Sequence, residues 1–186
     1  MQSEIKKTIK TLIDGNTILY PTDTVWGIGC DATNREAVAK IFKIKQRCES
    51  KSLVLLVDSL EMLQQYVENL PKKVITILKT KLKPTTIIYK NPKRLADNAV
   101  ANDNTVAIRI VEDKFCQQLI SEFGKPIVST SANVSGEPTP KSFQEIDKSI
   151  LDAVDYVVNL HQDKINNTAS RIIKIDEDDG VVVIRA

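Results

Sequence analysis

The chain has 186 residues, of which 42% are hydrophobic and 27% charged, a composition typical of a globular protein that predicts one domain over residues 1–186. Its 26 basic and 24 acidic residues give a net charge of +2, which excludes a strongly acidic or basic tail protein. Three cysteines without a Cys-x-x-Cys pair and one histidine argue against disulfides and cysteine- or histidine-based metal sites, and favour a reducing cytoplasm. No apolar run reaches the roughly 20 residues of a membrane span, so we expect no membrane partner.

Hydrophobic periodicity and capping residues predict six helices. These cover residues 5–13 before Gly15, residues 35–45 after Asn34, short segments after Ser59 and after Pro71, residues 113–123 before Gly124, and a segment from a Ser142–Glu145 capping box to about Leu151. Apolar and β-branched runs predict strands over 17–20, 53–57, 85–89, 105–110, 127–129, 156–158, 171–175 and 181–185, with a hairpin turn at 176–180. This alternation predicts an α/β domain built on a mixed sheet.

The first of three polar stretches contains Thr22-Asp23-Thr24, followed by Gly27 and Gly29. Loops at strand ends commonly bind ligands in α/β proteins, but a tight turn explains the same composition equally well. Gly27-x-Gly29-x-x-Ala32 also matches the dinucleotide-binding fingerprint. Because Pro21 and a polar loop stand where a strand should lead directly into the first glycine, we interpret that match as coincidental.

The second polar stretch, Lys45-Gln46-Arg47 followed by Lys51, ends a predicted helix. Cations at this position stabilise a helix without any ligand, but the predicted buried strand over 53–57 brings the turn against the sheet. The third stretch, Ser131-Ala132-Asn133 with residues 135–138, is rich in hydroxyl and amide groups. Such groups bind ribose or phosphate oxygens, or form local turns with their own backbone.

Arg109 lies within Val106–Ile110, a strand that we expect to be buried. A buried arginine must be paired with an acidic group or bind an anion. Both an anion site and a structural ion pair with an unidentified carboxylate are therefore open.

Six segments with a specific order cover nearly the whole chain: Tyr20–Gly29, Lys45-x-Arg47, Thr105–Arg109, Ser131-Ala132-Asn133-x-Ser135-Gly136, Ser170 and Arg185. Together they resemble the YrdC-like family, the L-threonylcarbamoyladenylate synthases. The resemblance implies an α/β fold in which a twisted mixed β-sheet, with helices packed on it, surrounds a basic concave cavity. It also implies a nucleotidyltransferase that converts L-threonine, bicarbonate and ATP into threonylcarbamoyl-AMP and pyrophosphate, for modification of adenosine 37 in tRNA.

The resemblance assigns roles to particular residues. It places Lys45 and Arg47 in catalysis and on the triphosphate of ATP. It assigns Thr22, Arg109 and Ser170 to the binding of L-threonine. The guanidinium of Arg109 would bind the threonine carboxylate through two hydrogen bonds. The resemblance assigns further ATP contacts to Thr105, Ser131, Asn133 and Arg185. Mg²⁺ is expected with ATP, held mainly by phosphate oxygens rather than by a protein metal site, and RNA or tRNA and the proteins that complete tRNA modification are expected partners.

The sequence departs from the family pattern at Trp26, Ser52, Leu82-Lys83-Pro84, Val111 and Arg171. The second position usually holds proline, and the third is usually a Pro-Gly-Pro turn that shapes one wall of the cavity. The last two usually hold proline and threonine.

Two other functions remain open. One is a non-catalytic module that binds double-stranded RNA in the same basic cavity, although one tryptophan, four tyrosines and four phenylalanines offer few stacking surfaces for bases. The other is a carbamoyladenylate-forming enzyme acting on carbamoyl phosphate, an activity that usually belongs to larger multidomain chains.

Overall fold

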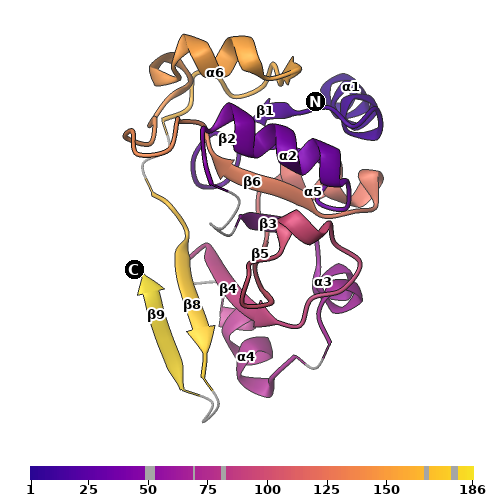
Figure 1. The fold of residues 1–186 in the computed structure, drawn as a ribbon, viewed down its shortest axis with the longest axis vertical. Coiled ribbons are helices and arrows are strands. Elements are labelled where there is room, and N and C mark those ends of the chain that lie inside the picture. Colours follow the sequence, from indigo (N-terminus) through magenta and orange to yellow (C-terminus); the bar gives the residue numbers. More distant parts are fainter. Residues whose placement is uncertain (49–52, 69, 81–82, 166–167, 177–179) are drawn as a thin grey trace.

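A mixed β-sheet runs through the molecule and carries the helices (Figure 1). The computed structural model describes residues 1–48, 53–68, 70–80, 83–165, 168–176 and 180–186. Within these residues the strands are β1 (Ile18–Tyr20), β2 (Gly27–Gly29), β3 (Val54–Val57), β4 (Thr85–Lys90), β5 (Thr105–Ile110), β6 (Ile127–Ser131), β7 (Tyr156–Val157), β8 (Arg171–Ile175) and β9 (Val181–Arg185). Their order in the sheet is β7-β1-β2-β6-β3-β5-β4-β8-β9, so β9 forms one edge.

The helices of the described residues pack along the sheet, including its middle strands. They are α1 (Gln2–Ile13), α2 (Arg35–Ile44), α3 (Leu60–Tyr66), α4 (Lys72–Thr80), α5 (Lys114–Phe123) and α6 (Lys148–Ala153), with 3-10 turns η1 (Asp97–Ala99) and η2 (Phe143–Glu145). In Figure 1, α1, α2 and α6 lie near β1 and β2 in the upper half, and α3 and α4 lie in the lower half. The β8–β9 hairpin extends along the left side.

The strand pairing confirms the predicted mixed sheet. The pairs β1–β7, β3–β5 and β4–β8 are parallel, and the remaining neighbours are antiparallel. Three predicted strands, 105–110, 171–175 and 181–185, have the bounds of β5, β8 and β9. The hairpin pairing of β8 with β9 is confirmed, but residues 177–179 of the predicted turn lie outside the described residues.

Local capping chemistry fixes the helix ends as predicted. Asn34 Oδ1 accepts a hydrogen bond from Ala37 N at 3.1 Å, and Ser59 Oγ accepts one from Met62 N at 3.2 Å. Gly124 adopts a φ of +76° directly after α5, a left-handed conformation that glycine adopts without steric cost.

One strand was not predicted, because Gly27–Gly29 was expected to be part of a polar loop. Its residues form β2 in the interior of the sheet. A Cβ atom on Gly29 would lie 2.5 Å from the carbonyl oxygen of Val128 and 2.7 Å from the Tyr20 ring. The glycine therefore permits close packing between neighbouring strands. This packing explains why a strand forms here although glycine has a low β-propensity.

The predicted helix from Ser142 to Leu151 is wrong at its start. Ser142 makes no capping hydrogen bond with its side chain, and Glu145 Oε2 accepts one from Lys141 N at 2.9 Å. Asp147 Oδ1 instead accepts from Ser149 N at 2.7 Å and caps α6. A second carboxylate two residues further along thus provides the stronger helix start.

The position of β5 in the sheet sets up a functional site. Successive side chains of a strand point to opposite faces, so Ile108 enters the hydrophobic core while Ala107 and Arg109 face the other way. Arg109 is level with Leu56 on the adjacent parallel strand β3. In the described part of the chain, no helix combines the length and apolarity needed to cross a membrane.

Glu4 joins the N-terminal helix to the segment around β7. Its carboxylate accepts hydrogen bonds from Tyr156 Oη at 2.6 Å, from Asn159 N at 3.0 Å and from Lys7 Nζ at 3.0 Å. The Tyr156 hydrogen bond is the main reason that the pKa of Glu4 is lowered to about 2.

We expect Glu4→Gln to lower the free energy of unfolding by about 1–3 kcal/mol at neutral pH, because hydrogen bonds to a charged acceptor are lost. A folded-state pKa below the ordinary value means that the carboxylate stabilises the fold above pH 4.5 and loses this effect as the pH falls toward 2. Urea unfolding at several pH values, with exposed Lys10→Gln as the control, measures both effects. Equal stability of Glu4→Gln and the natural protein at pH 7 contradicts the prediction.

Candidate functional site

A cavity of about 310 Å³ lies over one face of the sheet and is lined by three arginines from distant parts of the chain, Arg47, Arg109 and Arg185. We call it the arginine cavity. Thr24, Ser131 and Ser170 also line it, and no carboxylate occurs among its described lining residues. The basic concave cavity expected from the sequence is therefore present. Its positive charge comes from three arginines brought together by the fold, because the net charge of the chain is only +2.

Arg109 is paired with Asp23 beneath the arginine cavity. The guanidinium, whose side chain is only 3% exposed, donates through Nη1 to Asp23 Oδ1, and its Nη2 lies 3.4 Å from Thr24 Oγ1. Among the described residues, neither Arg109 Nε nor Asp23 Oδ2 has a hydrogen-bond partner, although both atoms are buried. The ion pair thus exists, and it leaves the Nε–Nη2 edge of the guanidinium with unused donor capacity.

The loop before β2 holds Asp23 in place. Thr22 Oγ1 accepts a hydrogen bond from Thr24 N at 3.0 Å and donates one to the carbonyl oxygen of Val25 at 2.7 Å. Thr22 is buried and does not line the arginine cavity, whereas Thr24 does. Thr22, which was predicted to bind threonine, therefore shapes the loop, and Thr24 lines the cavity.

Lys45 connects the end of α2 to the loop after β6. Its Nζ donates to the carbonyl oxygens of Ser131 at 2.5 Å and Asn133 at 2.6 Å, and its own carbonyl oxygen accepts from Ser135 N at 2.9 Å. The residue is only 2% exposed. Burial, and then the neighbouring charge of Arg47, lower the pKa of Lys45 to about 8.

Arg47 follows Lys45 after a reversal of the backbone at Gln46, which has a φ of +49°. This reversal directs Arg47 into the arginine cavity, where burial lowers its pKa. The predicted contact of this turn with the sheet is confirmed for residues 45–47, and Lys51 lies outside the described residues.

The opposite wall of the arginine cavity is built by the two ends of the β8–β9 hairpin. Arg185 donates through Nε and Nη2 to the carbonyl oxygen of Ser170, at 3.0 and 2.7 Å. Ser170 Oγ in turn lies 2.8 Å from Thr86 Oγ1. Arg185 and Arg109 line the same cavity, and the pKa of Arg185 is lowered first by burial and then by the charge of Arg109.

Three predicted ATP contacts, Lys45, Thr105 and Asn133, do not line the arginine cavity. Asn133 lines an adjoining hollow of about 500 Å³, and Thr139 borders both spaces. Thr105 donates its hydroxyl to Asp103 at 2.6 Å and stands four residues before Arg109 on β5, roughly 13 Å away along the strand. The structure therefore does not bring Thr105 together with the three arginines.

Besides Thr24, three residues of this region were not assigned a role from the sequence: Asp23, Thr86 and Thr139. Asp23 is the acidic group of the first polar stretch, which is a usable signal once a buried arginine needs a partner. Thr86 and Thr139 carry no comparable signal, because only the fold brings them to Ser170 and to the cavity.

Comparison with known proteins agrees with this site. The family model for Sua5, YciO and YrdC proteins, described as "Telomere recombination", matches residues 10–186. The chain belongs to this family. The threonylcarbamoyl-AMP synthase of Pseudoalteromonas translucida is 35% identical over 161 residues, which cover 85% of this chain and 86% of that protein. The putative threonylcarbamoyl-AMP synthase of Methanocaldococcus jannaschii is 36% identical over 99% of this chain and 87% of its own length.

Solved structures extend the comparison to the fold. P. abyssi Sua5 complexed with L-threonine has a TM-score of 0.88 and 25% identity, over 97% of this chain and 53% of that one. E. coli YciO has a TM-score of 0.87 and 23% identity, over 100% of this chain and 89% of that one. The family member described here therefore spans about half the length of the Sua5 chain.

We expect Asp23→Ala to destabilise the protein by about 3 kcal/mol, because it leaves the buried Arg109 guanidinium without its counter-charge. The double variant Asp23→Ala/Arg109→Met should lose less stability than Asp23→Ala, because it leaves no unpaired buried charge. Denaturant unfolding of four proteins, the natural one, Asp23→Ala, Arg109→Met and the double variant, measures this coupling. Additive losses in the double variant contradict an energetic link between the two side chains.

Proposed function

We propose that this protein is an L-threonylcarbamoyladenylate synthase, a nucleotidyltransferase that joins L-threonine, bicarbonate and ATP into threonylcarbamoyl-AMP with release of pyrophosphate. The observation that carries the proposal is the arginine cavity, which the paired and buried Arg109 lines together with two further guanidinium groups. The names of the relatives and the L-threonine complex of P. abyssi Sua5 support the same chemistry. The product would supply the modification of adenosine 37 in tRNA.

Arg109 is the proposed anchor for L-threonine. Asp23 holds Nη1, so the Nε–Nη2 edge is the part of the fork that can receive the carboxylate in a two-point contact. Thr24 and Ser170 line the same space and offer hydroxyl groups to the amino acid. Thr22 acts on this site through the loop that it organises.

The proposed ATP site begins at Arg47 and Arg185 and continues past Ser131 toward the adjoining hollow. Arg47 and Arg185 carry charges that burial makes costly, so the negative charge of a bound polyphosphate would offset this cost. Asn133 lines the hollow into which the nucleoside part would extend over Thr139. The ATP contact expected of Thr105 stays a prediction, and its hydroxyl is bound to Asp103 outside the arginine cavity.

The chemistry requires positioning and charge stabilisation. The amine of threonine and bicarbonate form a carbamate with loss of water, a carbamate oxygen attacks the α-phosphorus of ATP, and pyrophosphate leaves with the bonding electron pair. Arg47, Arg185 and Lys45 stabilise the negative charge that shifts onto the departing phosphates, which is the usual source of catalysis in transfers of phosphorus groups.

Mg²⁺ would accompany ATP in this site and reduce the charge of its phosphates. Among the described residues no cluster of three His, Cys, Asp or Glu side chains is placed to hold a metal, and hydroxyl groups line the arginine cavity beside its three arginines. This donor set fits an ion held mainly by phosphate oxygens and water. A cytoplasmic setting and transfer of the product to tRNA-modifying proteins are part of the same proposal.

We expect a product with the mass of threonylcarbamoyl-AMP when the protein is incubated with ATP, L-threonine, bicarbonate and Mg²⁺, and its loss when any one substrate is omitted. Arg109→Lys should lower product formation about a hundredfold, because an ammonium cannot form the two-point contact. Exposed Arg94→Lys is the matched control. Mass spectrometry of the reaction measures the outcome.

Two results would contradict the assignment. Product formation from carbamoyl phosphate but not from threonine and bicarbonate would identify the other carbamoyladenylate chemistry. Salt-dependent affinity for double-stranded RNA without any ATP turnover would identify the RNA-binding alternative.

We also expect kcat/KM for ATP to decline as the pH rises through about 8. Lys45 is charged below this pH and loses its proton above it, because burial lowers its pKa, and the free-enzyme pKa governs kcat/KM. Burial penalises the charged form, so the free energy of unfolding should increase over the same range, between pH 8 and 10.5. Lys45→Met should lower kcat/KM about tenfold to a hundredfold and remove this step from the pH profile. A profile of Lys45→Met that keeps the step assigns it to another group.

A further inference from the structure

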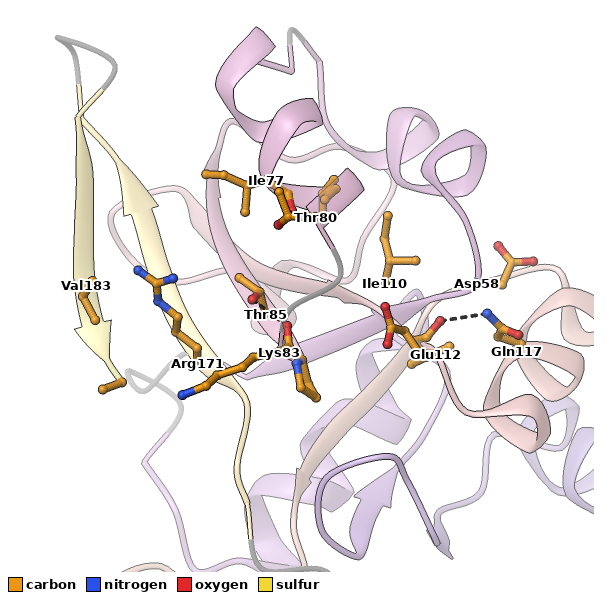
Figure 2. A pocket seen from close by; sticks show the side chains of 14 residues that line it. Asp58, Ile77, Thr80, Lys83, Thr85, Ile110, Glu112, Gln117, Arg171 and Val183 are labelled. Carbon is orange, nitrogen blue, oxygen red and sulfur yellow. Dashed lines mark hydrogen bonds between the residues drawn. The ribbon is translucent and has the colours of Figure 1, made fainter.

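A second and larger cavity, of about 760 Å³, lies against the other face of the same strands (Figure 2). We call it the rear cavity. On β5, Ile110 lines the rear cavity and Arg109 lines the arginine cavity. On β8, Arg171 lines the rear cavity and Ile172 lines the arginine cavity. The two cavities are therefore separated by one layer of the sheet.

The rear cavity has charges of opposite sign at its two sides. Figure 2 shows Arg171 and Lys83 toward the Val183 side, and Glu112 and Asp58 toward the opposite side, near α5. No ion pair joins any of these four charged side chains to another described residue. Two cations and two carboxylates that share one hollow without pairing are separated in space and available to a ligand that carries both charges.

The space between these charges is apolar. Ile77 and Leu78 of α4 cover it, and Ile110 and Val111 at the end of β5 form its floor. Val183 on β9 also lines it and is 47% exposed. Covering such surface is favourable by about 25 cal/mol per Å², and the volume falls within the range of small-molecule sites.

Three of the positions at which this sequence departs from the family pattern line the rear cavity: Lys83, Val111 and Arg171. Two of them supply both of its cations. The charge distribution of the rear cavity is therefore a property of this chain's own residues.

We propose that the rear cavity binds a short, zwitterionic, apolar peptide, with its carboxylate at Lys83 and Arg171 and its amine at Glu112 and Asp58. Its occupancy would also change L-threonine affinity in the arginine cavity, and this second statement rests on the proposed function. Arg171 directly follows Ser170, whose carbonyl oxygen holds Arg185. A ligand that fixes the Arg171 side chain therefore restrains the backbone of the arginine cavity wall.

The test uses the tripeptide leucyl-alanyl-leucine as the probe and calorimetry or methyl NMR of the full chain as the readout. The free tripeptide should bind at least tenfold more tightly than its N-acetylated and C-amidated forms, each of which lacks one charge. Arg171→Gln and Glu112→Gln should each weaken binding about tenfold. Lys174→Gln, which removes a cation on the same strand outside the rear cavity, should bind like the natural protein, and methyl shifts should centre on Ile77, Ile110 and Val183.

Absence of binding, equal binding of all three peptide forms, or unchanged binding in both cavity variants overturns the proposed site. The coupling is measured separately as the Kd for L-threonine with and without saturating tripeptide, for which we expect a change of at least threefold. An unchanged Kd overturns the coupling and leaves the site in place. If L-threonine does not bind at all, the proposed function fails, while the peptide titration still decides the rear cavity.

Discussion

The burial of a guanidinium within the central strand β5 is the constraint on which the rest of this structure depends. Removing the charge of Arg109 from water is costly unless a carboxylate compensates it, and Asp23 provides that compensation from 86 residues away in the sequence. The loop of residues 22–25 must therefore close over the sheet at this point. Its closure brings Thr24 to the cavity, and among the described residues Arg109 Nε keeps no hydrogen-bond partner.

Two further positive charges, Arg185 and Lys45, are bound within the described residues by carbonyl oxygens rather than by carboxylates. Arg185 is bound by a carbonyl oxygen, and Lys45 is bound by two. Carbonyl dipoles orient a cation but leave its full charge in place, so the site keeps a strong attraction for anions. The same hydrogen bonds tie the end of α2 to the loop after β6, so the charge and the shape of the cavity have a common origin.

The regular elements could be predicted because their signals are local. Hydrophobic periodicity, the cap residues Asn34 and Ser59, and Gly124 fix helices within a few neighbouring residues. Strand β2 could not be predicted, since its glycines are explained only by contact with Tyr20 and Val128.

For the site, the ordered motifs predicted all three arginines of the cavity, Arg47, Arg109 and Arg185, and the two serines Ser131 and Ser170. Asp23 is a usable candidate for the acidic partner of Arg109, but only the fold shows that its loop reaches residue 109. The distance of Thr105 from the arginine cavity depends on the register of β5 in the sheet. The charges of the rear cavity come from separate elements. Neither could be predicted without the structure.

The edge strand β9 has a consequence for the behaviour of the protein in concentrated solution. Its side chains from Val181 to Ile184 are aliphatic and 38–57% exposed, and its outer backbone edge is unpaired within the sheet. Such an edge can recruit a strand from another molecule and begin aggregation. The acidic sequence Asp-Glu-Asp-Asp at residues 176–179 precedes it directly, and like charges beside an apolar strand oppose such association. Solubility of this chain should therefore depend on a segment that takes no part in its chemistry.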